Sequence, residues 1–196
     1  MRYDAYLREG AIAPDFSKRL ADRFEELENT WTFGVYIDGL LASSFRLHVA
    51  QAGSTDTPAM EVFPEILKSE IEAGKTIVDP SRFVADWTVA RRYPELPYLT
   101  VRLGYMAAEY FETDLVLATV RTEHQAFYKR VFGHREVCPP RSYLTLTKPL
   151  SLMTLDYPAA RERILRRHPF FRSTLFERRM LFERTVEPVA LQRSAA

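Results

Sequence analysis

The fold is decided by the stretch WTFGVYIDGLLASSFRLHV, residues 31–49. Aromatic and β-branched residues stand on both sides of Asp38-Gly39, a dipeptide that strongly indicates a two-residue hairpin turn. We therefore expect two antiparallel strands, 31–37 and 40–49. Alternation along the second strand puts apolar side chains on one face and polar side chains on the other, namely Phe45, Leu47 and Val49 against Ser44, Arg46 and His48.

Helices and strands alternate along the rest of the chain. Apolar residues at helical spacing predict a helix over 14–27, with Phe16 and Phe24 on its apolar face. The strand predicted at 76–85 should be irregular or splayed, because it contains Pro80 and proline cannot donate to a sheet ladder. The other predicted segments are helices at 64–73, 97–110 and 123–132, strands at 76–85, 115–120 and 141–147, a linker at 87–95, and two C-terminal helices at 158–167 and 173–184.

Composition is typical of a soluble protein with one core. Of the 196 residues, 46% are hydrophobic and 27% are charged, and a chain of this length builds one domain. We expect the core at about 14–148 and a helical extension at about 149–196. The formal net charge of +1 gives no overall field for holding nucleic acid. The one cysteine, Cys138, excludes a disulfide framework and a cysteine-rich zinc site, so no metal site is expected. With no apolar signal segment or spanning segment, the expected location is the cytoplasm.

Short motifs narrow the fold further. The hairpin runs into Ser44 and Arg46, a helical stretch contains the dipeptide Phe-Pro at 63–64, and the sequence DPSRFV occupies 79–84. The element order resembles an α/β, GNAT-like (acyl-CoA N-acyltransferase) fold, which is a mixed central sheet flanked by helices. Over residues 31–137 the motifs resemble the acyl-homoserine-lactone (autoinducer) synthases and, more closely, the long-chain N-acyl amino acid synthases.

This resemblance implies an acyltransferase. In these families an acyl group moves from the thioester of acyl carrier protein to an amine, and the matching positions here are Arg46, Asp79, Ser81 and Arg82. The homoserine-lactone synthases usually have glutamate where this chain has Asp79. Their N-terminal pattern of Arg, Phe, Trp and two Asp, which helps to hold S-adenosylmethionine, is not found before Trp31. The resemblance therefore favours an amino acid or similar amine as acceptor over the lactone-forming reaction.

Acyl transfer to an amine needs a proton acceptor. Asp79 is the candidate base, and His48 is the second candidate. The alternatives are that Asp79 pairs with Arg82 or caps the bend at Pro80, and that His48 is an ordinary residue of the polar face. Strict alternation puts Asp79 and Ser81 on one face and Arg82 on the other, so the three share a cleft only if the strand bulges.

The reaction also needs an anchor for the acceptor and a hydrogen-bond donor for the oxyanion. Arg46 and Arg82 are the candidate anchors, because guanidinium groups bind carboxylates with two hydrogen bonds. Their alternative is an ion-pair network with Asp79 or Asp86. By analogy with the fold, a backbone N–H near Val84 or Ala85 meets the oxyanion.

The expected donor is the acyl-phosphopantetheine of acyl carrier protein, with acyl-CoA as the alternative and no permanently bound cofactor. Acetyl-CoA enzymes of this fold bind pyrophosphate with a glycine-rich turn, and the corresponding stretch 89–97 has no glycine. Acyl carrier protein is acidic, so its docking surface should be basic. The candidate docking residues are Arg91, Arg92, Lys129, Arg130 and Arg135.

Other features leave alternatives open. The apolar residues Leu99, Leu103, Met106 and Tyr110, together with Phe170-Phe171, either wall an acyl tunnel or form ordinary core. The C-terminal arginines extend the basic patch, pair with their own glutamates or face a membrane surface. A CoA-dependent acetyltransferase and a non-catalytic acyl- or carrier-protein-binding module are the alternative functions.

Overall fold

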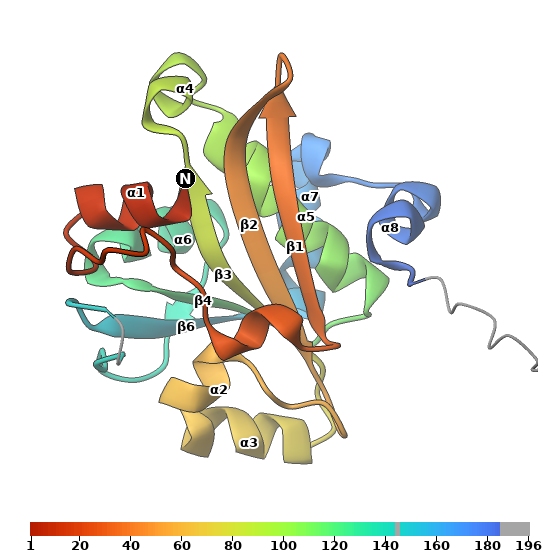
Figure 1. Ribbon diagram of the computed structural model, residues 1–196. Helices are drawn as coiled ribbons and strands as arrows, with labels where there is room; N and C mark the ends of the chain where they lie inside the picture. Colours follow the sequence, from red (N-terminus) through yellow and green to blue (C-terminus); the bar gives the residue numbers. More distant parts are fainter. Residues whose placement is uncertain (144–145, 185–196) are drawn as a thin grey trace, which may run out of the picture.

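A six-stranded mixed sheet organises the protein, in the order β1-β2-β3-β4-β6-β5 (Figure 1). The structure is a computed structural model that describes residues 1–143 and 146–184. The strands are β1 Thr30–Ile37, β2 Leu40–Ala50, β3 Ile77–Ala85, β4 Leu115–Arg121, β5 Arg135–Glu136 and β6 Leu150–Asp156. The helices are α1 Arg2–Arg8, α2 Pro58–Val62, α3 Pro64–Glu72, α4 Trp87–Arg92, α5 Leu96–Tyr110, α6 Gln125–Val131, α7 Tyr157–Arg167 and α8 Leu175–Phe182, with short 3-10 turns η1 Arg23–Glu26, η2 Thr122–His124 and η3 Pro169–Phe171.

The predicted hairpin is confirmed. Strands β1 and β2 are antiparallel, and Asp38 and Gly39 both have positive φ, 51° and 77°, as a tight hairpin turn requires. The predicted alternation also holds on β2. Phe45, Leu47 and Val49 belong to the main hydrophobic cluster, whereas the polar side chains of this strand face the N-terminal segment.

Strand β3 is irregular in two ways. It pairs with β2 along its length but with parallel β4 at only two positions, Ile77 and Val78, so the two strands separate after Val78. Between the pairs Ser44↔Val84 and Arg46↔Ser81, one residue of β2 stands opposite two residues of β3. This is a β-bulge, and Arg82 within it has φ 51°. The splayed, irregular strand expected around Pro80 is therefore confirmed.

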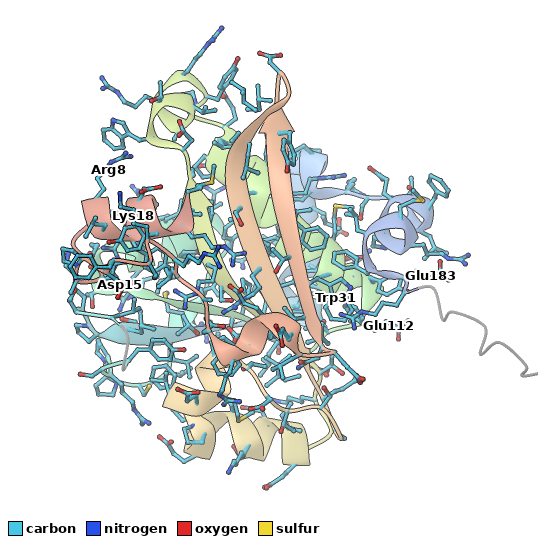
Figure 2. All side chains as sticks on the ribbon, in the orientation of Figure 1. Arg8, Asp15, Lys18, Trp31, Glu112 and Glu183 are labelled. Atoms are coloured by element: carbon cyan, nitrogen blue, oxygen red, sulfur yellow. The ribbon has the colours of Figure 1, made fainter. Side chains whose placement is uncertain are left out.

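Helices cover both faces of the sheet. Long helix α5 packs behind β1 and β2, with α7 and α8 beside it, and the cluster there includes Tyr105, Ile164 and Phe182 (Figure 1). Helices α2 and α3 form a second cluster, in which Phe63 and Leu67 pack against strand residues. Figure 2 shows Trp31 where α8 ends, and its ring contacts those of Phe111 and Phe182. The fold class is confirmed as mixed α/β.

Several predicted segments differ in the structure. The helix expected over 14–27 is wrong, because Asp15 accepts a hydrogen bond from the Ser17 N–H and turns the chain, and Phe16 is fully exposed. Helix α1 precedes this segment instead. The linker expected at 87–95 contains α4 instead. Asp86 caps the N-terminus of this helix by accepting hydrogen bonds from two backbone N–H groups.

The C-terminal third also differs from expectation. Arg141 forms only an isolated bridge with Leu150, so the strand expected at 141–147 is not observed in its described part, and residues 144 and 145 lie outside the described residues. Strand β6 was not predicted and lies between β4 and β5. The segment after residue 148 thus supplies a strand to the sheet as well as α7 and α8, the two predicted helices.

Three of the four residues predicted for the apolar stripe of α5 pack in or against the core, namely Leu103, Met106 and Tyr110, and only Leu99 departs from it. Leu99 is 44% exposed, while Val101, Tyr105 and Ala108 are buried. Phe171 stacks on Tyr105 with ring centroids 5.2 Å apart, and Phe170 is exposed. Within the described residues, no helix combines the length and the apolar character needed to cross a membrane.

Candidate functional site

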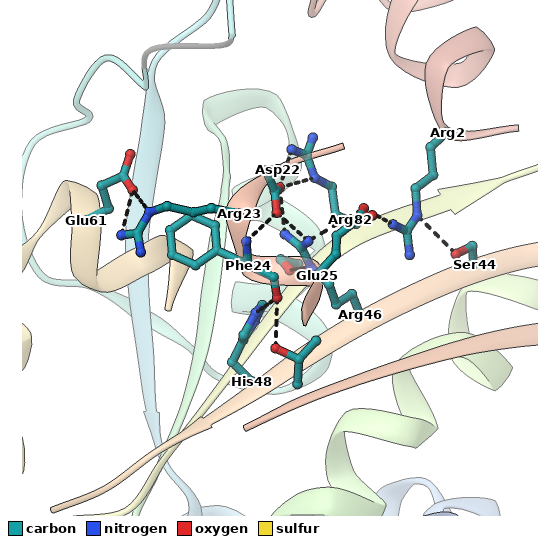
Figure 3. A network of polar contacts seen from close by, with 12 residues as sticks. Arg2, Asp22, Arg23, Phe24, Glu25, Ser44, Arg46, His48, Glu61 and Arg82 are labelled. Atoms are coloured by element: carbon teal, nitrogen blue, oxygen red, sulfur yellow. Dashed lines mark hydrogen bonds and ion pairs between the residues drawn. The ribbon is translucent and has the colours of Figure 1, made fainter. Parts of the chain in front are cut away.

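Two arginines from neighbouring strands meet on one carboxylate (Figure 3). Arg46 Nη1 and Nη2 donate to the two oxygens of Asp22 at 2.6 and 2.9 Å. Arg82 Nε and Nη2 both donate to Asp22 Oδ2 at 3.1 and 2.6 Å. Burial alone would raise the pKa of Asp22, but the hydrogen bonds from the two guanidinium groups outweigh it and hold that pKa well below its usual range. Asp22 therefore stays ionised.

Four further side chains extend this network. Arg2 donates from Nε to Ser44 Oγ at 3.3 Å and from Nη1 to Glu25 at 2.9 Å, and Arg46 donates from Nε to Ser81 Oγ at 3.1 Å. Together the cluster of Arg2, Asp22, Glu25, Arg46 and Arg82, called here the arginine cluster, has three guanidinium groups and two carboxylates. It carries one excess positive charge, which is what a single bound carboxylate would neutralise.

The local structure explains how these residues meet. Arg46 extends from the polar face of β2, and the bulge in β3 brings Ser81 and Arg82 to the same side. Asp22 is the N-cap of η1 and also accepts from the Phe24 N–H, which fixes its position over the strands. The condition set for Asp79, Ser81 and Arg82 was a bulge, and the bulge is present: it brings Ser81 and Arg82 to the network, while Asp79 lies buried against the Ala59 N–H.

Arg46 and Arg82 differ in how much of each guanidinium is free. The side chain of Arg46 is 1% exposed, and all three of its nitrogens donate to Asp22 or Ser81. Within the described residues, Arg2 Nη2 has no hydrogen-bond acceptor, and Arg82 Nη1 has none besides the Tyr6 side chain, whose ring centroid lies 5.4 Å from the Arg82 guanidinium carbon. The arrangement leaves Arg2 and Arg82, rather than Arg46, with donors for a ligand.

The two candidate bases lie deeper than the arginines. Asp79 is 1% exposed, and its Oδ2 accepts from the Ala59 N–H in the first turn of α2 at 2.9 Å. Its Oδ1 has no partner in the described residues, and burial raises the pKa of Asp79 to about 6. His48 is fully buried, its Nε2 lies 3.1 Å from the Phe24 carbonyl, and burial lowers its pKa to about 4. His48 is therefore an interior residue, not one that contacts an open cleft.

The end of β3 offers a free backbone donor. The Asp86 N–H donates to the Ala42 carbonyl on β2 at 2.8 Å. Successive N–H groups of a strand point to opposite edges, so the Ala85 N–H points to the edge that β4 has left and the Val84 N–H points to β2. Of the two predicted positions, only Ala85 has the direction that an oxyanion donor needs.

Comparison with known proteins assigns this sequence to a family. The family model described as N-acyl amino acid synthase FeeM matches residues 1–156. The chain belongs to this FeeM family of N-acyl amino acid synthases. It is an acyltransferase, as its sequence motifs implied. A comparison with curated protein sequences gives no match.

Solved structures agree on the fold. FeeM itself, described as an N-acyl amino acid synthase from uncultured soil microbes, is 21% identical with a TM-score of 0.66, over 84% of this chain and 85% of FeeM. TofI, solved with an inhibitor and MTA, is 16% identical with a TM-score of 0.58, over 87% of this chain and 88% of TofI. BjaI, a CoA-dependent acyl-homoserine lactone synthase, is 16% identical with a TM-score of 0.57, over 85% of this chain and 77% of BjaI.

The basic residues predicted for docking occupy two regions of this FeeM-family chain. Arg91 and Arg92 are exposed on α4, beyond the end of β3, while the other three lie on α6 and β5 (Figure 1). Lys129 interacts with Gln125 and Glu136, and Arg130 and Arg135 are exposed. Of the C-terminal arginines, Arg179 pairs with Glu183, and others donate to backbone carbonyls, namely Arg163, Arg167 and Arg178.

The sequence motifs missed three residues of the arginine cluster. All three belong to the N-terminal segment, Arg2 in α1 and the other two, Asp22 and Glu25, in the part where a helix over 14–27 was expected. One signal was present in the sequence. An arginine on a strand with apolar neighbours, such as Arg46, requires a carboxylate partner when it is buried. That requirement does not say which carboxylate will meet it.

Proposed function

We propose that this acyltransferase moves a fatty acyl group from a phosphopantetheine thioester to the amine of an amino acid or similar acceptor that carries a carboxylate. The observation that carries the proposal is the excess positive charge of the arginine cluster beside the bulge of β3. Family membership supplies the reaction class, and the cluster supplies a reason for an anionic acceptor.

The acceptor carboxylate binds between Arg2 and Arg82 in this proposal. These two side chains keep unused N–H donors, and Arg2 is the more exposed of them at 18% of its side chain. Arg46 acts as a positioning residue, because its guanidinium holds Asp22, which in turn holds Arg82. Ser81 supports the same arrangement by accepting from Arg46 Nε.

Asp79 is the proposed proton acceptor. A carboxyl group with a pKa of about 6 is a better base near neutral pH than an ordinary aspartate, and its Oδ1 is unpartnered. Because Asp79 is buried, the proton reaches it through water rather than by direct contact. The released proton comes from the acceptor ammonium, whose neutral nitrogen attacks the thioester carbon. The C–S bond then breaks, and the pantetheine sulfur leaves as the thiol, taking up the second proton that the attacking nitrogen loses as the amide forms.

The Ala85 N–H is the proposed oxyanion donor. It lies on the free edge of β3, where backbone donors point to the space that β4 has left. The thioester carbonyl placed there has the arginine cluster on one side of β3 and the apolar helix α5 on the other. The nitrogen and the acyl chain thus approach from opposite faces of the sheet.

Acyl carrier protein is the proposed donor. In the stretch that holds a glycine-rich turn in acetyl-CoA enzymes, residues 89–92 here belong to α4 and residues 96–97 to α5. Asp86 already accepts from the Thr88 and Val89 N–H groups at the start of α4. A carboxylate at that position repels a pyrophosphate. In this proposal Arg91 and Arg92 on the same helix bind the acidic carrier protein. The proposed location of the reaction is the cytoplasm.

The experiment is a reaction of the purified protein with acyl carrier protein or CoA thioesters and a mixture of amino acids, followed by mass spectrometry. N-acyl amino acids formed faster from the carrier-protein donor are the expected result. Faster reaction from CoA assigns the donor to CoA, and an absence of acylated amines from both donors contradicts the proposal.

A charge reversal separates docking from chemistry. Replacing Arg91 and Arg92 with glutamate should raise KM for the acyl carrier protein at least tenfold and leave the rate with a short acyl-pantetheine donor unchanged. The matched control reverses Arg166 and Arg167, an exposed arginine pair on α7. If both double variants raise KM for the acyl carrier protein equally, α4 is not part of the docking surface.

A further inference from the structure

The C-terminal extension lies outside the region that family membership explains. The FeeM model matches residues 1–156, and helix α7, the turn η3 and helix α8 all follow that match. The residues proposed for catalysis, acceptor binding and donor docking all precede this extension. Its exposed side chains are therefore available for a separate function.

The extension carries the positive charge of the protein. Residues 157–184 contain eight arginines and three glutamates, a net charge of +5, whereas the whole chain has a formal net charge of +1. Residues 1–156 have a net charge of −4, since residues 185–196 contain one arginine and one glutamate. An asymmetry of this kind between two parts of one chain favours an anionic partner for the basic part.

Most of these arginines have no carboxylate partner. Arg161 pairs with Glu109 and Arg179 pairs with Glu183, and the other six form no ion pair within the described residues. Some donate to backbone carbonyls, as Arg163 does, which leaves the charge of the guanidinium uncompensated. Seven of the eight arginines are exposed. The positive charge of the extension is thus on its surface, where an anion can reach it.

Helix α8 adds an exposed apolar face to this charge. Phe182 attaches the helix to the protein, where it is buried and its ring contacts that of Trp31. The opposite side of the helix carries Leu175, Phe176 and Met180, which are 59%, 73% and 70% exposed. Figure 1 shows α8 at the edge of the molecule, beyond α5. One exposed apolar side chain is ordinary, but three on one short helix form a patch that marks an interaction site.

Arg102 fixes how this face is presented. From α5 it donates to the Phe170 carbonyl at 2.8 Å, to the Arg172 carbonyl at 2.9 Å and to the Glu177 carboxylate at 3.2 Å. Thr174 and Glu177 form a capping box at the start of α8. The turn before α8 is therefore pinned to α5, and the helix is held with its apolar side outward.

Apolar side chains next to arginines match a membrane surface that contains anionic lipids. Arg179 follows Leu175 by four residues and Phe176 by three, so it shares their face of α8. Arg172 is exposed just before the helix. Apolar groups that enter the lipid surface, with arginines that contact lipid phosphates, are the arrangement of interfacial helices. A nucleic acid would match the arginines but leave the apolar side chains in water.

The face of α8 is separate from the proposed docking surface for the carrier protein. Helix α8 runs beside the second half of α5, where Arg102 contacts Glu177 and Tyr110 contacts Phe182. Helix α4, which carries the docking arginines, ends at Arg92 and precedes the first turn of α5. The carrier protein and a membrane can therefore bind different parts of the molecule.

We propose that the exposed face of α8, with the arginines around it, binds the surface of a membrane that contains anionic lipids. The C-terminal extension holds the enzyme against the lipid headgroups as a peripheral protein. This inference does not rest on the proposed function, because it uses neither the acceptor site nor the acyl donor.

Vesicle binding tests the proposal without any need for catalysis. The whole protein is mixed with vesicles of about one third phosphatidylglycerol in phosphatidylcholine, or with vesicles of phosphatidylcholine alone, and bound protein is measured by flotation. Binding to the anionic vesicles should be at least tenfold tighter, and it should weaken as salt is added, because salt screens the attraction between arginines and phosphates. A protein that stays unbound with both kinds of vesicle would overturn the proposal.

A double substitution tests the apolar face. Phe176→Ser combined with Met180→Ser should lower the affinity for anionic vesicles at least tenfold. The matched control, Tyr36→Ser with Leu40→Ser, removes two apolar side chains of similar exposure, 65% and 67%, at the β1–β2 hairpin. This control should bind like the unchanged protein. Unchanged binding by the α8 variant, or an equal loss in the hairpin variant, would contradict the proposal.

A charge reversal distinguishes the membrane from the carrier protein. Arg172→Glu with Arg179→Glu should also lower the affinity for anionic vesicles at least tenfold, while Arg91→Glu with Arg92→Glu should leave it unchanged. The KM for the acyl carrier protein should show the reverse pattern. If the Arg172 and Arg179 variant raises that KM and binds vesicles normally, the face belongs to the carrier protein and the proposal is wrong.

A second copy of the chain is the alternative occupant of an apolar face. Analytical ultracentrifugation without lipid compares the unchanged protein with the variant that combines Phe176→Ser and Met180→Ser. The same mass for both supports the proposal. A dimer that this variant disperses would assign the face of α8 to self-association and overturn the membrane assignment.

Discussion

The carboxylate of Asp22 accepts two hydrogen bonds from Arg82, at 3.1 Å from Nε and 2.6 Å from Nη2. The two residues are sixty positions apart in the sequence. Their contact joins the N-terminal segment to the bulged part of β3, and Arg46 joins the same carboxylate from β2. The N-terminal segment therefore completes the proposed acceptor site.

Asp22→Asn tests how much the fold depends on this carboxylate. The substitution leaves Arg82 without a charged partner and Arg46 with only Glu25, 3.8 Å away, so we expect the free energy of unfolding to fall by about 3–5 kcal/mol. The control is Asp56→Asn, which breaks an exposed pair with Arg23 and should cost less than about 1 kcal/mol. Urea unfolding of both variants provides the comparison. Similar losses for the two would show that the Asp22 pair is no stronger than a surface pair.

Arg82→Lys tests the acceptor anchor. Lysine keeps the charge but cannot both hold Asp22 through two nitrogens and offer a third donor to the acceptor, so KM for the amino acid should rise about tenfold to a hundredfold. The KM for the acyl donor should stay the same. Arg23→Lys, at an exposed position, is the control. A drop in kcat with unchanged KM for the acceptor would place Arg82 elsewhere in the mechanism.

Asp79→Asn separates the proposed base from its structural contact. An asparagine oxygen can still accept from the Ala59 N–H, while the proton acceptor is lost, so kcat should fall about a hundredfold or more. If the rate is unchanged, Asp79 serves only to hold α2.

Asp79→Asn should lower kcat but raise the free energy of unfolding. The pKa of Asp79 is higher in the folded state, about 6, than its ordinary value of 3.8. The stability that its proton contributes is fully present below pH 3.8 and is lost as pH rises through about 6. Asp79→Asn should therefore unfold with a free energy higher by up to about 3 kcal/mol above pH 6, and the gain should vanish toward pH 4. A loss of stability at every pH would contradict this.

Gly104→Ala should fill the small space between α5 and the strands β2 and β3 without disturbing the helix. A Cβ at this position would lie 3.4 Å from the Phe45 ring and 3.8 Å from Pro80, which are ordinary contacts. Alanine inside a helix is favoured over glycine by about 1 kcal/mol, so the melting temperature should rise. Rates with a series of acyl lengths should shift toward shorter chains. An unchanged length preference would indicate that the acyl chain does not pass Gly104.

Local signals predicted the part of the site that lies on neighbouring strands. The Asp38-Gly39 turn and the alternation along β2 place Arg46 on the polar face, and the structure has it there. The need for Ser81 and Arg82 to share a side required a bulge, and the structure contains one. These predictions succeed because turn chemistry and strand alternation act between residues close in sequence.

The contacts that sequence reasoning missed depend on distant residues or on competing local bonds. No periodicity relates Asp22 to strands that follow it by more than twenty residues. The helix expected over 14–27 fails because the Asp15 side chain bonds the Ser17 N–H, an interaction that competes with helical hydrogen bonds. Strand β6 is buried at most of its positions and lacks the alternation by which a half-buried strand is recognised.

The most direct test of the central claim compares acceptors with and without a carboxylate. The purified protein is given an acyl carrier protein thioester and either an amino acid or the amine formed by its decarboxylation, and the acylated products are measured by mass spectrometry. The account predicts N-acyl amino acids and at least tenfold lower kcat/KM for the decarboxylated amines. Equal rates for the two kinds of acceptor would contradict the role given to the arginine cluster.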